Sequence, residues 1–465
     1  MAKALHALKE HLNYRNWKLC YVSYGTYVAQ VYAEKYPDDV RALILDSPIS
    51  DISTYYNHNS SNYLHGLENM FKDCAASPDC QALYPNLEEI YYKTIAALEK
   101  NPITVPVDKS VVPSGRFTYN ADDFKIAIHQ ALYQKILVEV LPLLIQDFHD
   151  RNEPTLGALV SAFAGALRLD YGVYYCVSCT EALPNNALEQ YRQDAESHPG
   201  LSGGLSFYRS DFVVCNKWNQ LEALDSSQLQ PPMLPAQVPT LVIAGEYDPI
   251  TPLSNGQALH RQYPQVQLVE AETFGHAAGF SNNGRKIVEA FFNAPDQPVD
   301  DLFEQATIQF ATHVYKHEGL AAMGNSLNGG DLLFFAPLLI ALLISIGALL
   351  VYPVVIVRRR KVDSGASQGL RVLLTIGSVL AVAILVGLGW GLNQTAAYNF
   401  YILAFGVLEQ YAFVFQLLLP FMLVLALAFL LFMVRIKKVE DRSIYFAVLF
   451  SHGLILVYLL YWGVL

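Results

Sequence analysis

The stretch Trp17-Lys-Leu-Cys-Tyr-Val-Ser-Tyr-Gly-Thr-Tyr-Val-Ala-Gln30 predicts the fold of the first part of the chain. The apolar run over residues 19–22 is typical of a short buried strand. Ser23 and Gly25 follow, and a helical pattern of apolar residues then continues until Pro37 ends it. A strand, a serine, a glycine and a helix in this order predict a nucleophile elbow, the tight turn that lifts a serine hydroxyl above a parallel sheet.

Three further apolar runs predict the rest of the sheet. Residues 41–46 follow the first helix, and a strand–helix–strand unit of this length places its two strands parallel. Residues 239–245 and 266–269 resume the strand pattern. The predicted class is therefore α/β, with active-site groups expected at the carboxyl ends of the strands.

The strand pattern disappears between about residues 51 and 235. Apolar residues recur there at helical spacing over residues 87–98, from residue 120 onward and over residues 136–148. This predicts a helical cap inserted between two strands of the sheet. Insertions of this kind typically shape the substrate pocket.

Ser23, Asp248 and His276 each follow a predicted strand, in the chain order of an α/β-hydrolase triad. We expect Ser23 to attack a carbonyl, His276 to act as general base and Asp248 to orient the imidazole. The backbone N–H of Tyr24 is the expected oxyanion donor. Asp46, after the preceding strand, is the alternative acid, and Asp248 has a structural alternative as a helix cap.

The six cysteines all lie in the first 215 residues, which favours an exported domain with disulfides. Cys74 and Cys80 flank a short Pro-containing loop and form the first expected pair. Cys20 lies within the elbow strand and is expected to be buried. One Cys-x-x-Cys pair suggests zinc, but no second pair or His-x-x-x-His accompanies it, so no metal is expected. Cys179 and Cys215 are further disulfide candidates, and the pairing stays open among Cys176, Cys179 and Cys215.

The chain is too apolar for an all-soluble protein, with 53% hydrophobic and 16% charged residues. The formal net charge is −11, and residues 1–330 carry about −15 of it, which argues against nucleic-acid binding. Four apolar segments each exceed the roughly 20 residues that cross a bilayer core. They are residues 332–357, 372–392, 411–434 and 444–465.

Basic residues flank these segments unevenly. Arg358, Arg359, Arg360 and Lys361 follow the first segment, and Arg435, Lys437, Lys438 and Arg442 follow the third, whereas residues 393–410 hold no Lys or Arg. The positive-inside rule therefore places both basic loops in the cytoplasm and residues 1–330 on the other side of the membrane.

Several motifs together resemble the proline iminopeptidase/tripeptidyl aminopeptidase family of serine peptidases over about residues 10–300. They are Val-Ser23-Tyr-Gly-Thr, the Cys74…Pro-Asp-Cys80 loop with Tyr84-Pro85, Cys179-Thr-Glu181, Cys215-Asn-Lys-Trp218, Gly245-Glu-Tyr-Asp-Pro-Ile-Thr-Pro252 and Gly275-His276. The resemblance implies an α/β-hydrolase with a helical cap that removes N-terminal residues or short peptides. It also implies that a cap carboxylate binds the substrate's free amine; by position Glu181 is a candidate, and the alternative is that Glu181 is an exposed helix-cap glutamate.

Two departures from that family bear on activity. Tyr21 stands where the family has a small residue, usually Gly. The family's first strands and their His-Gly-Gly-type loop, which donates a second oxyanion N–H, precede the elbow, whereas here only about sixteen residues do. This leads to the hypothesis that the sequence is an N-terminally truncated version of a longer enzyme with an incomplete parallel sheet.

The sequence therefore predicts a membrane-anchored serine hydrolase that needs no cofactor, most simply an aminopeptidase acting on peptides outside the cytoplasm. The alternatives are an esterase or lipase of the same fold and a decayed hydrolase that acts as a binding module. The expected domains are an α/β-hydrolase over residues 1–294 with its cap at about 51–235, a linker over 295–330, and four transmembrane helices over 331–465.

Overall fold

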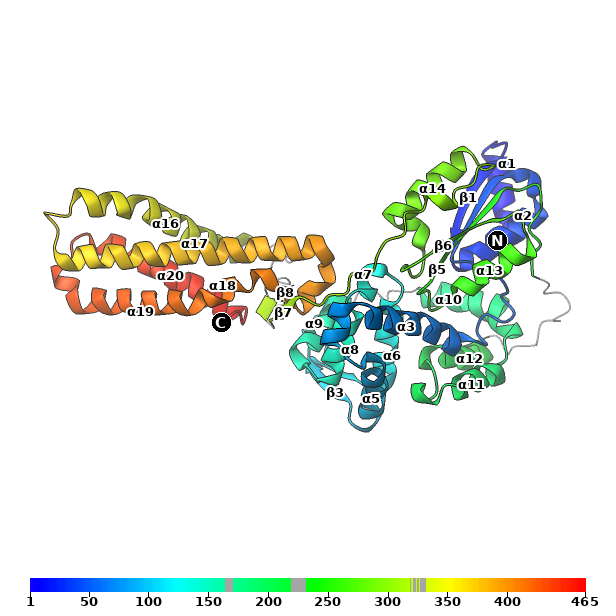
Figure 1. Cartoon of the computed structure of the whole chain (residues 1–465), viewed down its shortest axis with the longest axis horizontal. Coiled ribbons are helices and arrows are strands. Elements are labelled where there is room, and N and C mark those ends of the chain that lie inside the picture. The colour runs from blue at the N-terminus through cyan, green and yellow to red at the C-terminus, as the bar shows by residue number, and fades with distance from the viewer. Residues whose placement is uncertain (164–169, 219–230, 318, 321–322, 324–325, 327–331) are drawn as a thin grey trace. The chain divides into compact units, whose positions relative to one another are not determined.

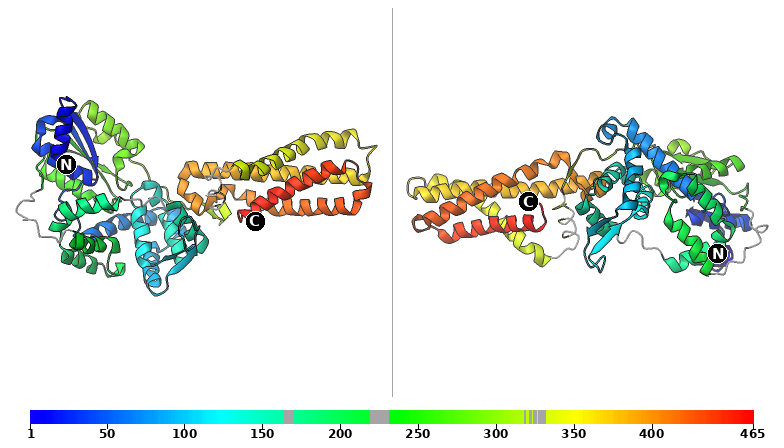
Figure 2. Two further views of the ribbon diagram at one scale, coloured as in Figure 1. Left: turned by 180° about the vertical axis from the view of Figure 1, so that it is seen from behind. Right: turned by 90° about the horizontal axis from the view of Figure 1, so that it is seen from below.

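The structure is a computed structural model, and it falls into two compact units (Figures 1 and 2). The first unit comprises residues 1–153 and 163–312, and the second comprises residues 154–162 and 313–465. The structure describes residues 1–163, 170–218, 231–317, 319–320, 323, 326 and 332–465.

The first unit is built on a four-stranded parallel sheet with the strand order β1-β2-β5-β6. The predicted parallel sheet is therefore confirmed. Because the strands run in one direction, their carboxyl ends meet at a single edge of the sheet, where ligands bind in open α/β folds. The strands are β1 (Trp17–Val22), β2 (Val40–Asp46), β5 (Thr240–Gly245) and β6 (Gln267–Ala271).

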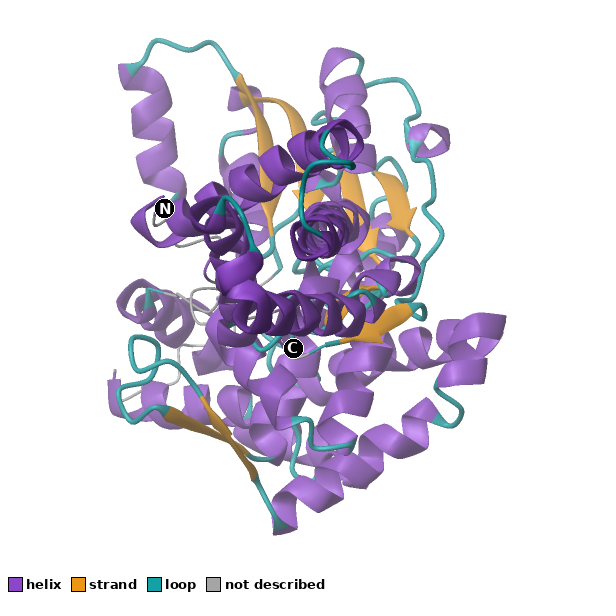
Figure 3. Cartoon of the chain, turned by 90° about the vertical axis from the view of Figure 1, so that its left-hand side faces the viewer, coloured by secondary structure: helices purple, strands orange, loops and turns teal. Residues whose placement is uncertain are grey.

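Alternating side chains of the strands fill two apolar layers, as the period of two in a strand requires. Leu43 and Leu45 of β2 pack on the side of α1, α2 and α13, whereas Ala42 and Ile44 pack on the side of α14. Figure 3 shows the strands of the sheet in orange among the helices. The helices are α1 (Ala2–His11), α2 (Tyr24–Lys35), α13 (Leu253–Gln262) and α14 (Asn282–Asn293).

β1 is an edge strand of the described sheet, since it pairs with β2 alone. Leu19 is the one buried residue of β1, and the expectation that Cys20 is buried is wrong, because its thiol is exposed. An edge strand is packed against neighbours on fewer sides than a central one, so residues next to a buried position stay open to solvent.

The chain between β2 and β5 forms the cap, which is mostly helical but also contains an antiparallel hairpin that the sequence analysis missed. Each hairpin strand has four residues, too few for a clear alternation pattern. The helix expected over residues 136–148 is two helices, because Pro142 fits only the first turn of a helix. The cap elements of the first unit are α3 (Asn59–Ala76), α4 (Pro78–Leu83), α5 (Leu87–Lys100), β3 (Ile103–Pro106), β4 (Arg116–Tyr119), α6 (Ala121–Ala131), α7 (Lys135–Val138), α8 (Leu141–His149), α10 (Tyr171–Val177), the π-helical turn η2 (Ser178–Ala182), α11 (Leu188–Glu196) and α12 (Ser206–Trp218).

Within the described residues, the second unit contains four helices that are long and apolar enough to cross a membrane. They span Leu332–Arg358, Gly365–Ala404, Glu409–Lys438 and Arg442–Tyr461, in agreement with the four predicted segments. The unit also holds residues 154–162 of α9 (Glu153–Phe163) and a short antiparallel pair that joins β7 (Val314–Lys316) to β8 (Gly406–Leu408). The four apolar spans contain the helices α16 (Leu332–Arg358), α17 (Gly365–Asn399), α18 (Phe413–Gln416), α19 (Leu418–Arg435) and α20 (Arg442–Tyr461).

The two basic loops of the second unit lie at the same end of the helix bundle (Figure 1). The Ser364 hydroxyl, after the first loop, donates a hydrogen bond to the Lys438 carbonyl in the second, at 2.9 Å. Arg371 of α17 forms ion pairs with Asp363 and Asp441, one from each loop. The bundle therefore presents one strongly basic end.

Candidate active site

Ser23 stands alone in the turn between β1, which ends at Val22, and α2, which begins at Tyr24. Its φ of 54° and ψ of −129° lie outside the regions that L residues ordinarily adopt. Although Ser23 is the N-cap residue of α2, its side chain makes no capping hydrogen bond. Its hydroxyl is therefore not used as an ordinary helix cap, and the strained strand-to-helix turn has the geometry of a nucleophile elbow.

Tyr21 fits this turn because position 25 is a glycine. A Cβ built on Gly25 would meet the Tyr21 ring at 3.0 Å and the Tyr21 Cβ at 3.6 Å. The two residues thus face each other across the elbow. The turn can hold a tyrosine at position 21, where the resembled family usually has Gly, because only Tyr21 and not Gly25 places a side chain in the space between them.

Asp248 and His276 form the polar pair at the carboxyl ends of β5 and β6. His276 Nδ1 lies 2.8 Å from Asp248 Oδ2, and the Asp248 side chain is fully buried. Asp248 Oδ1 accepts hydrogen bonds from the backbone N–H groups of Ile250 and Thr251, both at 2.9 Å. Asp248 does not cap the next helix, since the N-cap of α13 is Pro252. With Nδ1 held in this way, Nε2 of His276 is the nitrogen left for proton transfer.

The electrostatics of the pair favour an ionised carboxylate. Burial opposes the charge on Asp248, but attraction to His276, their hydrogen bond and the two N–H donors outweigh it and lower the pKa of Asp248. Burial likewise opposes the imidazolium, yet the charge and hydrogen bond of Asp248, with a further contribution from Asp46, raise the pKa of His276. The carboxylate therefore stabilises a proton on His276, as a general base requires.

Asp46, the alternative acid, is buried at the carboxyl end of β2 and accepts a hydrogen bond from Gly279 N at 2.9 Å. Burial raises the pKa of Asp46 to about 7, with the backbone donation from Gly279 acting in the opposite direction. His276 Nδ1 donates its hydrogen bond to Asp248 and not to Asp46. The structure thus distinguishes between the two candidate acids by their partners.

The turn that holds Ser23 and the loop that holds His276 are both hydrogen-bonded to residues at the carboxyl end of β2. Ser23 N donates to the Asp46 carbonyl at 3.1 Å, and Ala277 N donates to Ser47 Oγ at 2.9 Å. In the described part of the chain, Ser23 and His276 are not hydrogen-bonded to each other. The structure therefore brings Asp248 and His276 into direct contact and places Ser23 at the same edge of the sheet.

Two residues near the pair were missed by the sequence analysis. The Thr251 hydroxyl donates to Asp248 Oδ2 at 2.8 Å and lies 3.3 Å from His276 Nδ1. The Tyr133 ring lies 5.2 Å from the His276 ring, centroid to centroid. The Asp-x-x-Thr spacing was a usable signal for Thr251, whereas nothing local in the sequence marks Tyr133, which comes from the cap.

Glu181 of η2 faces the elbow. Its carboxylate accepts a hydrogen bond from the Tyr24 hydroxyl at 2.5 Å, and Tyr24 directly follows Ser23. Burial and this hydrogen bond raise the pKa of Tyr24, so the phenol stays protonated and donates. The cap carboxylate singled out in the sequence is therefore connected to the residue next to the candidate nucleophile.

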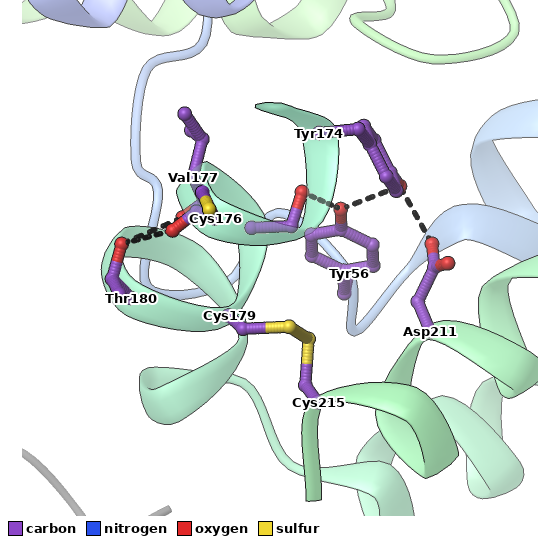
Figure 4. The surroundings of a disulfide bond; sticks show 9 residues. Tyr56, Tyr174, Cys176, Val177, Cys179, Thr180, Asp211 and Cys215 are labelled. Atoms are coloured by element: carbon purple, nitrogen blue, oxygen red, sulfur yellow. Dashed lines mark hydrogen bonds between the residues drawn. A yellow bond between two sulfur atoms is a disulfide. The ribbon is translucent and has the colours of Figure 1, made fainter. Parts of the chain in front are cut away.

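Two disulfides lie in the cap, as predicted for an exported domain. Cys74 pairs with Cys80, and Cys179 pairs with Cys215, which leaves Cys176 as an exposed free thiol. Figure 4 shows the second disulfide, which joins η2 to α12.

One group of side chains outside this site has metal-ligand composition. His6, Glu10 and Asp39 place one donor atom each within 4.8 Å of one another. However, Lys9 Nζ lies 2.7 Å from Asp39 Oδ1 and 2.9 Å from Glu10 Oε1. The lysine ammonium already supplies the positive charge that a metal ion would bring to these carboxylates.

Comparison with known proteins agrees with this geometry. Residues 205–303 match the family described as TAP-like protein. The chain is 27% identical over 283 residues to the serine protease Hip1 of Mycobacterium tuberculosis, which covers 56% of this chain and 52% of Hip1. It is 22% identical over 280 residues to the putative hydrolase YuaR of Escherichia coli, covering 58% of this chain and 54% of YuaR. The chain thus spans about half the length of these curated relatives.

Among solved structures, MGS-M2, an α/β hydrolase from a deep-sea metagenome library, aligns over 67% of this chain and 73% of its own. The sequence identity is 14% and the TM-score is 0.25. The parallel sheet, its elbow and the TAP-like match identify the first unit as an α/β-hydrolase domain with a helical cap.

Proposed function

We propose that this chain is a membrane-anchored serine hydrolase of aminopeptidase type. The observation that carries the proposal is the Asp248–His276 hydrogen bond of 2.8 Å, at the sheet edge where the strained Ser23 turn also lies. In this mechanism Ser23 Oγ attacks a peptide carbonyl while His276 takes its proton. His276 then protonates the leaving amine, and water hydrolyses the acyl-enzyme by the same route.

Tyr24 and Glu181 complete the proposed site. The N–H of Tyr24 is in the first turn of α2, where no intrahelical acceptor exists, and it binds the oxyanion. Glu181 binds the free α-amine of the substrate. The resemblance of the chain to aminopeptidases and the Tyr24–Glu181 hydrogen bond both favour this role.

A fluorophosphonate probe tests the nucleophile in the full-length protein. We expect covalent labelling that is lost in Ser23→Ala and retained in Ser281→Ala, a serine that caps α14. Rates on aminoacyl-arylamides and on simple acyl esters then distinguish peptidase from esterase. Serine-dependent ester turnover without any amide turnover would assign the chain to the esterases.

We further propose that the hydrolase unit lies on the extracytoplasmic side of the membrane. The basic end of the helix bundle favours the cytoplasm by the positive-inside rule, and the two disulfides favour an oxidising compartment for the cap. A membrane-impermeant maleimide tests this on intact cells. Labelling of the exposed free thiols Cys20 and Cys176 from outside is the expected result, and labelling only after lysis contradicts the assignment.

A further inference from the structure

The basic end of the helix bundle, formed by residues 358–371 and 435–442, carries a large excess of positive charge. These two stretches hold nine Lys/Arg and three Asp/Glu, a net formal charge of +6. Eight of the nine basic residues are exposed, namely Arg358, Arg359, Arg360, Lys361, Arg435, Lys437, Lys438 and Arg442. The positions of the acidic side chains decide how much of this charge is left for a partner.

The ninth basic residue, Arg371, is buried and takes up acidic side chains of both loops. It forms an ion pair with Asp363, whose side chain is also buried, and it lies 3.8 Å from a carboxylate oxygen of Asp441. Its guanidinium lies 5.7 Å from the centre of the Tyr445 ring. Arg359 also lies 3.8 Å from Asp441, whereas the other seven exposed basic residues form no ion pair within the described part of the chain. The positive charge of this end is therefore not neutralised inside the bundle.

Hydrogen bonds hold the two basic loops together, so their charges belong to one surface. The Ser364 hydroxyl donates to the Lys438 carbonyl at 2.9 Å, and the backbone N–H of Glu440 donates to Ser367 Oγ at 3.3 Å. A surface that is already ordered loses less conformational entropy when it binds a ligand than two independent loops would.

Apolar side chains lie directly beside these charges. Val357 precedes Arg358 at the end of one apolar span and is 76% exposed, and Val434 precedes Arg435 near the end of another and is 68% exposed. Val362 is 81% exposed and directly follows Lys361. The span ends therefore offer an apolar surface next to a cationic one. A molecule with an anionic head and an apolar tail matches both, whereas a free anion matches only the charges.

We infer that the basic end of the bundle binds the headgroups of anionic phospholipids. The exposed basic side chains of both loops hold the phosphate oxygens, and the arginines among them can do so through two parallel N–H···O bonds. The acyl chains lie along the exposed valines of the span ends. Clusters of four to eight Lys/Arg at the end of a membrane helix typically attract anionic lipids in this way.

Native mass spectrometry of the full-length protein in a neutral detergent tests this inference. With equal amounts of phosphatidylglycerol and phosphatidylcholine, we expect the anionic lipid to bind at least about tenfold more tightly, and added NaCl to weaken that binding. A variant that replaces four exposed basic residues, Arg360→Gln, Lys361→Gln, Lys437→Gln and Lys438→Gln, is expected to lose at least about tenfold in affinity. Each basic residue near an anionic surface contributes about fivefold.

A matched control removes the same charge from exposed lysines of the first unit, with Lys93, Lys100, Lys109 and Lys286 changed to Gln. This control is expected to bind phosphatidylglycerol as the parent protein does. The bundle variant is expected to keep the parent's unfolding temperature without added lipid, because the four side chains are exposed and form no ion pair among the described residues. The salt dependence of the parent protein tests the inference without any variant.

Three outcomes would overturn the inference. They are equal binding of the two lipids, binding in the bundle variant as tight as in the parent, and displacement of phosphatidylglycerol by excess inorganic phosphate, which would assign the surface to free phosphate. The binding needs no active site, so Ser23→Ala is expected to retain it. A failure of the proposed hydrolase activity would therefore leave this inference intact, and the reverse also holds.

Discussion

The ring of Tyr21 and the Cα of Gly25 face each other across the nucleophile elbow, so that a Cβ on Gly25 would lie 3.0 Å from Tyr21 Cδ1. Side chains on both sides of the serine are crowded in an elbow. Here the missing side chain of Gly25 leaves the space that the ring of Tyr21 occupies. The pair therefore acts as a unit, and its two members should be substituted together.

Gly25→Ala alone is expected to destabilise the protein by about 1–3 kcal/mol, because the ring has to shift in a packed turn. Tyr21→Gly with Gly25→Ala is expected to recover part of that loss, since the obstructing ring is gone. Thermal unfolding of the two single variants and the double variant measures the coupling. Strictly additive effects would show that the two residues do not oppose each other.

The backbone of Ser23 carries strain that a glycine would relieve. At φ 54° and ψ −129° a residue with a Cβ costs about 1–3 kcal/mol, whereas glycine adopts such angles freely. Ser23→Gly and Ser23→Ala both remove the nucleophile, but Ser23→Gly is expected to be the more stable of the two by about 1–2 kcal/mol. Equal unfolding temperatures for the two variants would indicate a relaxed turn.

The two buried acids are expected to differ sharply in their effect on catalysis. Asp248→Asn removes the charge that holds His276, and a loss of about 10³–10⁴-fold in kcat is expected. Asp46→Asn keeps an acceptor for Gly279 N and is expected to cost less than about tenfold. Substrate turnover by the two variants measures both, and a larger loss in Asp46→Asn would identify Asp46 as the functional acid.

The disulfide that joins η2 to α12 is expected to affect both the position of the Glu181 carboxylate and the free energy of unfolding. Cys179→Ser with Cys215→Ser removes a loop constraint of separation 36, which corresponds to roughly 3–4 kcal/mol. The preference for a substrate with a free amine is also expected to fall in this double variant, because Glu181 lies in η2. Cys176→Ser is the matched control, since that thiol is free and exposed, and it should change neither quantity.

The sequence was sufficient for the sheet and for the order of the candidate residues because both depend on local patterns. Buried strands such as β2 and β5 are short apolar runs, and Asp248 and His276 follow such runs directly. The four helices that are long and apolar enough to cross a membrane could be predicted in the same way, since length and apolar composition alone mark them.

What the sequence could not show depends on contacts between distant segments. Cys20 looked buried because its neighbours are apolar, yet its exposure depends on β1 lying at the sheet edge. The contact of Tyr133 with His276 and that of Glu181 with Tyr24 bring the cap onto the sheet across more than 140 residues of chain. No periodicity encodes such a contact, and Thr251 alone had a local signal in its spacing from Asp248.

The Asp248–His276 pair finally predicts that the optima of stability and activity lie at different pH. The pKa of His276 is raised, so its contribution to stability is complete below the unfolded value near 6.5 and is lost as pH rises through the folded value. The pKa of Asp248 is lowered, so its contribution is present above the unfolded value near 3.8 and is lost as pH falls through the folded value. The pair therefore stabilises the fold most between about pH 3.8 and 6.5. A general base, in contrast, must be neutral, so kcat/KM is expected to rise with a midpoint above about 6.5.

Because the charge of Asp46 also raises the pKa of His276, Asp46→Asn is expected to move that midpoint of the activity profile to lower pH. A rate profile from pH 5 to 9 beside thermal unfolding over the same range measures both, and an activity midpoint below 6 would show that His276 is not held as a charged partner of Asp248.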